Sequence, residues 1–439
     1  MDKKEIIAIL EDWNYWSKPF RKNISRERYE TEVVHKATAN EILFLKGVRR
    51  SGKSTILLNH IQNLITGGVP KESILFVNLE DPRFATSLSL DLLEEIKQTY
   101  IYYMNPSAKP YIFLDEVQNI DGFEKWLLKE YELQTSHLFA TGSNSKLLSK
   151  EIGSSLSGRY LDVQVSPLSF KEFLAFKGLV IEKAYDLVSK HREVERFFEQ
   201  FMLYGGFPKV VLTEDIYLKE AELKSYFDSI LLRDIVARYK LDNFRILEQL
   251  AILMLSSVGN PMSITKIKNR LGVSHDLASK YVEYLENTYM IQSVPLFDWS
   301  LQKQYVNPKK IYSIDTGLSK RVSFEVGKRM GDMLENIVYL ELKRRYADIY
   351  YFKTAQGYEV DFLLKEYEQI THLVQVSQTL ADEKTRKREL RALVKAKDEL
   401  KHTAETKLWL LTMDESSTEY VDGKTISVLN ILEWLLLDR

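Results

Sequence analysis

The residues whose types and spacing most clearly indicate chemistry lie between positions 47 and 55. The sequence there is G-V-R-R-S-G-K-S-T, which opens with the pattern G-x-x-x-x-G-K-[ST]. In this pattern glycines let main-chain N–H groups turn toward phosphate oxygens, the lysine reaches the β- and γ-phosphates, and the hydroxyl binds Mg²⁺. An apolar run before the pattern and helical periodicity after it argue against a chance glycine-rich turn. The run therefore predicts a site for ATP and Mg²⁺. The residues assigned to nucleotide binding are Gly47, Arg50, Ser51, Gly52, Lys53, Ser54 and Thr55.

Two adjacent carboxylates, Asp115 and Glu116, close the apolar run 111–114. We expect Asp115 to hold Mg²⁺ together with Ser54, and Glu116 to polarise the water that attacks the γ-phosphate. Lys53 and Glu116 are thus the first two catalytic candidates. The alternative is a surface turn after a buried strand. Against it, the phosphate-binding pattern and the acid pair occur in order and at a plausible spacing for one nucleotide site.

Two further catalytic candidates follow along the chain. The segment 137–145 reads as an apolar strand that ends in small polar residues, and Asn144 is the candidate for contacting the γ-phosphate or the attacking water, with Ser143 behind it. Ordinary turn chemistry accounts for the same residues. Arg159 is the candidate for stabilising transition-state charge, in its own subunit or from a neighbouring one, and a surface arginine is the alternative.

These side chains require strands that end at one edge of a sheet. Short apolar runs alternate with segments of helical periodicity, which predicts βαβ units and a mostly parallel sheet. The runs lie at 42–46, 74–79, 112–114, 138–140 and 161–165. We therefore expect an α/β ATPase core with an N-terminal helical segment over 1–170, followed by a mainly helical lid or linker over 171–244.

Composition excludes several classes of protein. The chain has 61 Lys and Arg against 62 Asp and Glu, so it is not a histone-like basic protein, although a local basic face remains compatible with this balance. The absence of cysteine excludes disulfides, thiolate metal sites and thiol nucleophiles. No run approaches the roughly 20 apolar residues of a membrane span, and the short N-terminal apolar run ends at Glu11 and Asp12. We expect a cytoplasmic protein with no membrane segment.

The segment 245–325 predicts a winged-helix domain. Residues 263–285 read as a helix, a tight turn at Gly272 and a second helix capped by Ser274, with a strand pair to follow. Such a unit places its second helix in the major groove of DNA, or serves as a contact module for another protein. The candidate base readers are His275, Ser279 and Lys280, and the candidate cations of the wing are Lys303, Lys309, Lys310, Lys320 and Arg321.

Five motifs in this order resemble the AAA-type ATPases of bacteria and archaea, sometimes called the archaeal ATPase family. They are GVRRSGKST at 47–55, LDEVQ at 114–118, ATGSN at 140–144, LSGR at 156–159 and PLSFKEF at 167–173. The resemblance covers nearly the whole chain. It implies a P-loop ATPase core that uses ATP and Mg²⁺, a helical lid, a winged helix, and a restriction-endonuclease-like α/β domain over 326–439.

The last domain departs from the nuclease pattern that this resemblance implies. Glu335 and Asp361 match the two acid positions, but Gln375 stands where a carboxylate would ligate metal and Ser377 where a lysine would position water. An amide oxygen is a weaker Mg²⁺ ligand than a carboxylate, and serine carries no positive charge. We expect a degenerate domain that is inactive as a nuclease.

Together these features predict Mg²⁺-dependent binding and hydrolysis of ATP that moves the C-terminal domains, which engage DNA or a protein partner. Two alternatives stay open. One is an ATP-gated switch with little turnover, against which Glu116 argues. The other is an ATP-regulated, metal-dependent nuclease. The oligomeric state is left open, because Arg159 fits either an isolated subunit or an oligomer.

Overall fold

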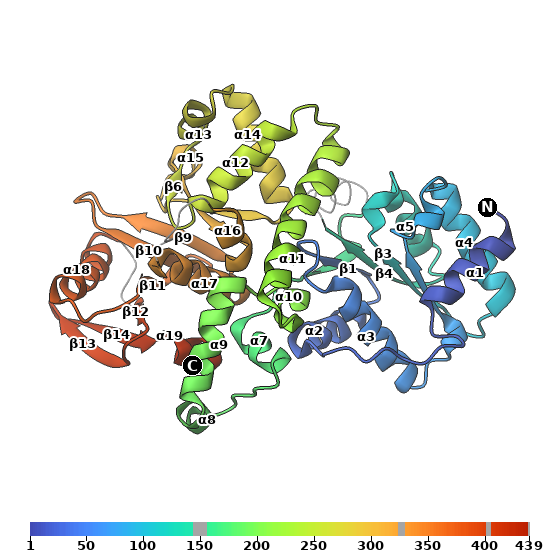
Figure 1. Ribbon diagram of the computed structural model, residues 1–439, viewed down its shortest axis with the longest axis horizontal. Coiled ribbons are helices and arrows are strands. Elements are labelled where there is room, and N and C mark those ends of the chain that lie inside the picture. The colour runs from blue at the N-terminus through green and yellow to red at the C-terminus, as the bar shows by residue number, and fades with distance from the viewer. Residues whose placement is uncertain (144–155, 324–329, 401–404, 438–439) are drawn as a thin grey trace. The chain divides into compact units, whose positions relative to one another are not determined.

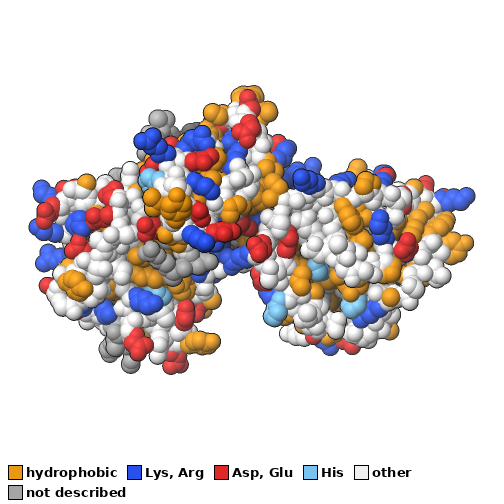
Figure 2. Space-filling model, turned by 90° about the horizontal axis from the view of Figure 1, so that it is seen from below, with side chains coloured by type: hydrophobic (Ala, Val, Ile, Leu, Met, Phe, Trp, Pro, Cys, Tyr) orange, Lys and Arg blue, Asp and Glu red, His pale blue; other side chains and the backbone are white. Residues whose placement is uncertain are grey.

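The computed structural model of the protein describes residues 1–143, 156–323, 330–400 and 405–437 (Figure 1). It divides into two compact units, Met1–Ser166 with Asn287–Tyr289, and Pro167–Glu286 with Met290–Arg439. Acidic and basic side chains are interspersed over the face shown in Figure 2. Among the described residues, none of the helices combines the length and the apolar character needed to cross a bilayer.

The first unit is built on a five-stranded sheet in the order β2-β3-β4-β1-β5, in which every neighbouring pair is parallel. Its strands are β1 (Ile42–Lys46), β2 (Ile74–Asn78), β3 (Tyr111–Asp115), β4 (His137–Gly142) and β5 (Tyr160–Gln164). The predicted α/β class with a parallel sheet is confirmed. A sheet of this kind is buried on both faces, which explains why its strands read as continuous apolar runs.

Helices cover both faces of this sheet. They are α1 (Lys3–Trp13), α2 (Glu27–Ala37), α3 (Lys53–Thr66), α4 (Leu90–Met104) and α5 (Phe123–Glu132). Successive residues of β1 face opposite ways. Leu43 and Leu45 pack in one core with side chains of α2 and α3, whereas Ile42 and Phe44 pack in another with side chains of α1, α4 and α5.

The second unit begins with helices. They are α7 (Phe170–Phe176), α8 (Ala184–Ser189), α9 (His191–Tyr204), α10 (Pro208–Leu212), α11 (Ile216–Ser229) and the π-helix η5 (Ile230–Ala237). Five more helices and a small antiparallel sheet in the order β6-β8-β7 follow among the described residues. These are α12 (Phe244–Ser256), β6 (Pro261–Met262), α13 (Ile264–Leu271), α14 (His275–Asn287), β7 (Ile291–Val294), α15 (Leu301–Val306), β8 (Lys309–Ser313) and α16 (Thr316–Val322).

The C-terminal part of this unit is a six-stranded mixed sheet in the order β13-β14-β12-β11-β10-β9. Its elements are α17 (Met330–Arg345), β9 (Asp348–Lys353), β10 (Glu359–Glu366), β11 (Gln369–Ser377), α18 (Glu383–Glu399), β12 (Lys407–Thr412), β13 (Ser417–Val421), β14 (Lys424–Asn430) and α19 (Ile431–Leu436). The strands β9, β10 and β11 are antiparallel neighbours, whereas β11, β12 and β14 run parallel.

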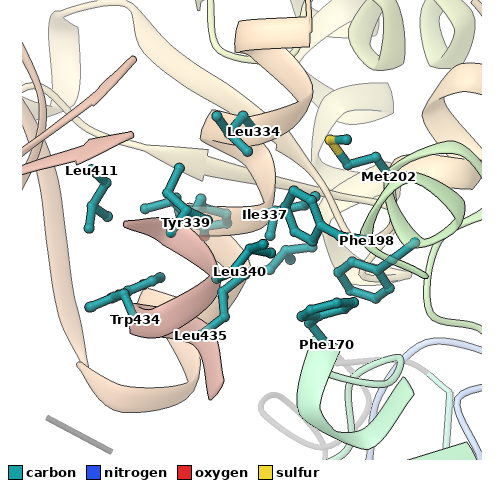
Figure 3. Close-up of a cluster of buried hydrophobic side chains, with 14 of the residues drawn as sticks. Phe170, Phe198, Met202, Leu334, Ile337, Tyr339, Leu340, Leu411, Trp434 and Leu435 are labelled. Carbon is teal, nitrogen blue, oxygen red and sulfur yellow. The ribbon is translucent and has the colours of Figure 1, made fainter. Parts of the chain in front are cut away.

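One apolar core joins segments of the second unit that lie far apart in the sequence (Figure 3). Phe170 of α7 and Phe198 of α9 pack in the same cluster as Leu340 of α17 and Leu435 of α19. All four side chains are less than a tenth exposed. The first helices of the predicted lid therefore share their core with the C-terminal domain.

Candidate nucleotide-binding site

The loop 47–52 connects the carboxyl end of β1 to α3, and its backbone needs glycine. Gly47 has φ +151° and lies so close to Val165 that a Cβ would meet the Val165 carbonyl oxygen at 2.0 Å. Gly52 has φ +100°, and Arg50, with φ +69°, occupies the left-handed region that residues with a side chain rarely adopt. The loop therefore adopts a backbone conformation that depends on glycine at positions 47 and 52.

The start of α3 is left open for an anion. Its N-cap is Gly52, and no side chain caps the first turn. The hydroxyl of Ser51 is buried and has no hydrogen-bond partner. Uncapped N–H groups at the positive end of a helix dipole attract negative charge. These features fit the phosphate groups of a nucleotide.

Lys53 is buried at the centre of the loop and is only 3% exposed. Its ammonium donates hydrogen bonds to the carbonyl oxygens of Gly47 at 3.0 Å and Val48 at 3.2 Å. It also lies 3.8 Å from Oε1 of Glu116. The structure thus brings together the lysine of the first motif and the second acid of the other motif.

Asp115 lies at the end of β3, beside the first turn of α3. Its Oδ1 accepts hydrogen bonds from the hydroxyl of Ser54 at 2.9 Å and from that of Thr141 at 2.6 Å. Burial, reinforced by the charge of Glu116, raises the pKa of Asp115 to about 6. A nearby cation would favour the ionised form. The carboxylate of Asp115 and the hydroxyl of Ser54 therefore form a pair of oxygen ligands that fits Mg²⁺, which prefers oxygen ligands.

Glu116 is held in an unusual backbone conformation next to Asp115. Its φ is +59°, and its main-chain N–H donates to the hydroxyl of Thr141 at 2.9 Å. The amide of Gln118 donates to Oε2 of Glu116 and to the hydroxyl of Ser143, the latter at 3.1 Å. Backbone strain of this kind persists where surrounding contacts enforce it, and it is common at functional sites. The carboxylate of Glu116 is thereby fixed in direction.

Three residues of this site have no counterpart among the sequence-based candidates. Thr141 and Gln118 orient the acid pair, and Arg26 donates to the carbonyl oxygens of Ser51 at 2.8 Å and Ser166 at 2.9 Å. Thr141 lies inside the motif ATGSN and Gln118 inside LDEVQ, so the sequence carries a usable signal for both. Arg26 lies outside every motif, and only the fold reveals its role.

The other predicted site residues divide into three groups. Thr55 is half-buried in α3 and Arg50 is exposed. Asn144 lies outside the described residues. Arg159 does not reach this site in its own subunit: its carbonyl accepts from the N–H of Ile42, at the start of β1, and its Nε lies 3.0 Å from Oε1 of Glu132.

The position of Arg159 corrects one of the two roles expected for it. It precedes β5, which runs parallel to β1, so it lies at the amino edge of the sheet. The loop 47–52 lies at the carboxyl edge. Action of Arg159 on the nucleotide of its own subunit is therefore excluded by the geometry, and only action from a neighbouring subunit remains as a prediction.

Comparison with known protein families assigns most of the chain to domains. The AAA domain matches residues 39–174, a range that contains every residue of the site just described except Arg26. Two domains of unknown function match residues 195–325 (DUF8612) and 330–434 (DUF4143).

Relatives match along almost the whole chain. An uncharacterised protein of Methanocaldococcus jannaschii, MJ1544, is 33% identical over 418 residues, which cover 92% of this chain and 90% of that protein. An uncharacterised protein of Haemophilus influenzae is 31% identical over 420 residues, covering 94% and 98% respectively. AMPPCP-bound DnaA from Aquifex aeolicus is a similar solved structure at 16% identity, covering 63% of this chain and 92% of that one, but its TM-score of 0.25 supports no conclusion.

Proposed function

The chain belongs to one family with these uncharacterised archaeal and bacterial proteins and contains an AAA-type ATPase domain, and from this premise we propose that it binds ATP with Mg²⁺ and hydrolyses it. The observation that carries the proposal is the convergence of four side chains on one sheet edge. Lys53 and Ser54 open α3, Asp115 ends β3 and Glu116 follows it directly; Ser54 is bonded to Asp115, and Lys53 lies beside Glu116.

Each of these residues has a distinct proposed role. The main-chain N–H groups of the loop and of the first turn of α3 bind phosphate oxygens, and Lys53 adds a positive charge. Ser54 and Asp115 hold Mg²⁺, which when bound neutralises charge on the phosphates. Glu116, oriented by Thr141 and Gln118, positions the attacking water. Asn144 keeps its predicted place near the γ-phosphate as part of this proposal.

Steady-state hydrolysis of ATP by the full chain tests this function. The wild type is expected to turn over ATP only with Mg²⁺, and Glu116→Gln is expected to bind ATP but to lose most turnover. Turnover that is equal in the two proteins would refute the catalytic assignment. Tight ATP binding with negligible turnover in the wild type would favour the alternative of an ATP-gated switch.

We also propose that ATP turnover moves the C-terminal parts of the chain, which engage DNA or a protein partner. The order α12, β6, α13, α14, β7, β8 supports a winged-helix domain, because three helices precede the closing strand pair of a small antiparallel sheet. Exposed cationic or titratable side chains on α13 and α14 favour DNA as the first partner to test. They are Lys266, Lys268, Arg270, His275 and Lys280.

The expected wing needs one correction. Lys303 is well exposed, but Lys310 is buried and only 1% of its side chain is accessible. Lys310 is therefore not available to a DNA backbone. Of the cations expected for the wing, only Lys310 is withdrawn, and Lys309 of the same strand is partly exposed.

Binding of labelled double-stranded DNA at several salt concentrations tests the DNA proposal. Replacing Lys266 and Lys280 with alanine is expected to weaken binding and to reduce the slope of log K against log salt by about 1 for each lost phosphate contact. Lys387→Ala, on the exposed face of α18, is the matched control. No DNA binding at low salt, together with ATP turnover that DNA and RNA leave unchanged, would favour a protein partner.

A further inference from the structure

A buried lysine from β8 lies among three carboxylates of the C-terminal domain. The ammonium of Lys310 is 2.9 Å from Oδ1 of Asp361, 2.9 Å from Oε1 of Glu359 and 3.1 Å from Oε1 of Glu335. The acids come from α17 and β10, while the lysine comes from the small sheet of the segment 245–325. We call these four residues the Lys310 cluster.

The surroundings of the cluster complete its hydrogen bonding. The hydroxyl of Tyr312 donates to Oε1 of Glu335 at 2.7 Å, and the N–H of Val376 donates to Oδ2 of Asp361 at 3.0 Å. The backbone at Gly259 approaches so closely that a Cβ there would lie 3.3 Å from Oε2 of Glu335. The segment 245–325 therefore covers Glu335 as well as supplying the cation of the cluster.

The three carboxylates of the cluster explain how a lysine can be buried there. Moving an ammonium or a carboxylate out of water costs several kcal/mol unless close partners compensate. An ammonium has three donors, and here three carboxylates lie within hydrogen-bonding distance of it. Burial and the charge of Asp361 raise the pKa of Glu335 to about 7, which lowers the excess negative charge further.

A divalent metal ion is the other cation that three carboxylates commonly hold. Its oxygen ligands lie at about 2.0–2.6 Å, so it needs the volume that the ammonium of Lys310 fills. Within the ranges that the structure describes, no group of three His, Cys, Asp or Glu side chains is arranged to hold a metal ion. A divalent metal ion and the ammonium of Lys310 therefore cannot occupy the cluster at the same time.

The residues beside the cluster are engaged in structural hydrogen bonds. The carboxamide of Gln375 accepts from the N–H of Asp361 at 3.2 Å and donates to Oε2 of Glu389 at 2.8 Å. The hydroxyl of Ser377 donates to the carbonyl of Thr379 at 2.9 Å. Neither residue presents a charge toward the acids.

We propose that Lys310 is a built-in cation that takes the place of a divalent metal ion among Glu335, Glu359 and Asp361. The cluster then fastens β8 to the C-terminal sheet and makes that domain independent of metal. This inference is separate from the ATPase function, because none of its residues takes part in nucleotide binding.

Binding of Mn²⁺ to the full chain without nucleotide, followed by electron paramagnetic resonance, is the first test. The wild type and Asp361→Asn are expected to bind Mn²⁺ equally. The wild type is also expected not to cleave plasmid or single-stranded DNA in Mg²⁺ or Mn²⁺. Either Mn²⁺ binding or DNA cleavage that depends on Asp361 would overturn the proposal. Glu359→Gln provides a milder comparison, since this side chain is 35% exposed.

Thermal unfolding of Lys310→Met is the second test. Removing the ammonium leaves buried carboxylates uncompensated, so the Tm is expected to fall by on the order of 10 °C. Adding Glu335→Gln to Lys310→Met is expected to recover part of that loss. Strictly additive losses in the double variant would contradict the proposal. If Lys310→Met does not fold, the Mn²⁺ comparison of the wild type with Asp361→Asn and Glu359→Gln decides the question.

Discussion

The hydroxyl of Ser54 donates a hydrogen bond to Oδ1 of Asp115 over 2.9 Å, although the two residues are 61 positions apart. Ser54 belongs to the first turn of α3 and Asp115 to the end of β3. These are the two side chains proposed to hold Mg²⁺. Their contact means that folding of the parallel sheet already brings the proposed metal ligands together, so that a metal would replace a hydrogen bond rather than reorganise the site.

Replacing Lys53 with alanine is expected to weaken ATP binding by two orders of magnitude or more. The substitution removes a buried positive charge at the centre of the loop, where charge-assisted hydrogen bonds to phosphate oxygens are stronger than neutral ones. Equilibrium titration with a fluorescent ATP analogue measures the change. Lys125→Ala, at an exposed position of α5, is the matched control and should leave affinity unchanged. Equal affinity of Lys53→Ala and wild type would contradict the role of the loop.

Glu116→Gln should lower kcat by about 10²–10⁴-fold while ATP affinity stays close to that of the wild type. The loss follows from removing the carboxylate that Gln118 orients directly, while Thr141 holds the main-chain N–H of the same residue. Gln118→Ala should lower kcat by less, since the carboxylate remains but is free to rotate. Single-turnover measurements at saturating ATP separate these effects from binding. A Gln118→Ala protein with unchanged kcat would show that orientation of Glu116 does not limit hydrolysis.

Gly47→Ala should destabilise the first unit strongly, by roughly 2–4 kcal/mol. The new Cβ would collide with the carbonyl of Val165, which lies 2.0 Å from its position. Urea unfolding monitored by fluorescence measures the loss. Gly331→Ala is the control, because a Cβ there has no heavy atom within 4 Å and its φ is not positive. Equal stability of the two variants would show that the loop relaxes away from Val165.

Arg159 is predicted to act on the nucleotide of a neighbouring subunit. Arg159→Ala and Glu116→Gln should each be nearly inactive, and mixing them should restore part of the ATPase activity. The restored activity arises because one interface of a mixed oligomer then combines an intact Glu116 with an intact Arg159. Activity is measured over a series of mixing ratios. Mixtures that never exceed the sum of the separate proteins would rule out this role.

Asp315 makes the stability of the second unit depend on pH. It is fully buried, and burial raises its pKa to about 6, although the main-chain N–H groups of Gly206, Leu318 and Gly317 favour the ionised form. The folded chain therefore binds this proton more tightly than the unfolded chain, whose Asp has an ordinary pKa of 3.8. The contribution of this group to stability rises as the pH falls from 7 through 6, by at most about 3 kcal/mol.

Comparison with Asp315→Asn isolates this titration from that of other groups. Urea unfolding of both proteins at pH 7.5, 6.5 and 5.5 gives the difference in free energy of unfolding. The difference should move in favour of the wild type on acidification, because the asparagine does not titrate. A difference that stays constant across this range would mean that Asp315 has a similar pKa in the folded and unfolded chains.

The nucleotide-binding loop and the sheet could be predicted because their signals are local. The apolar run 42–46 coincides with β1, and the motif that follows it lies at the start of α3. Parallel strands place their carboxyl ends at one edge, so the residues at and after the ends of β1 and β3 come together there, with Ser54 bonded to Asp115 and Lys53 beside Glu116. Spacing along the chain was enough to find them.

Contacts across the fold could not be predicted in the same way. The sequence predicts that Lys310 is one of the cations of a wing, together with Lys303 and Lys309. Its burial follows from the packing of β8 against α17 and β10, which brings Glu335 and Asp361 to it. Likewise, Arg159 precedes a strand whose place beside β1 only the sheet reveals. Such pairings depend on topology rather than on residue type.

The core that joins α7 and α9 to α17 and α19 has a practical consequence for dissecting this protein. A fragment cut at residue 325 would leave Phe170 and Phe198 without the apolar side chains that cover them, and it would be prone to aggregate. Cleavage between Ser166 and Pro167, by contrast, leaves that cluster intact on one piece. Expression trials of the second unit should therefore begin at Pro167, before the helices that follow the ATPase sheet.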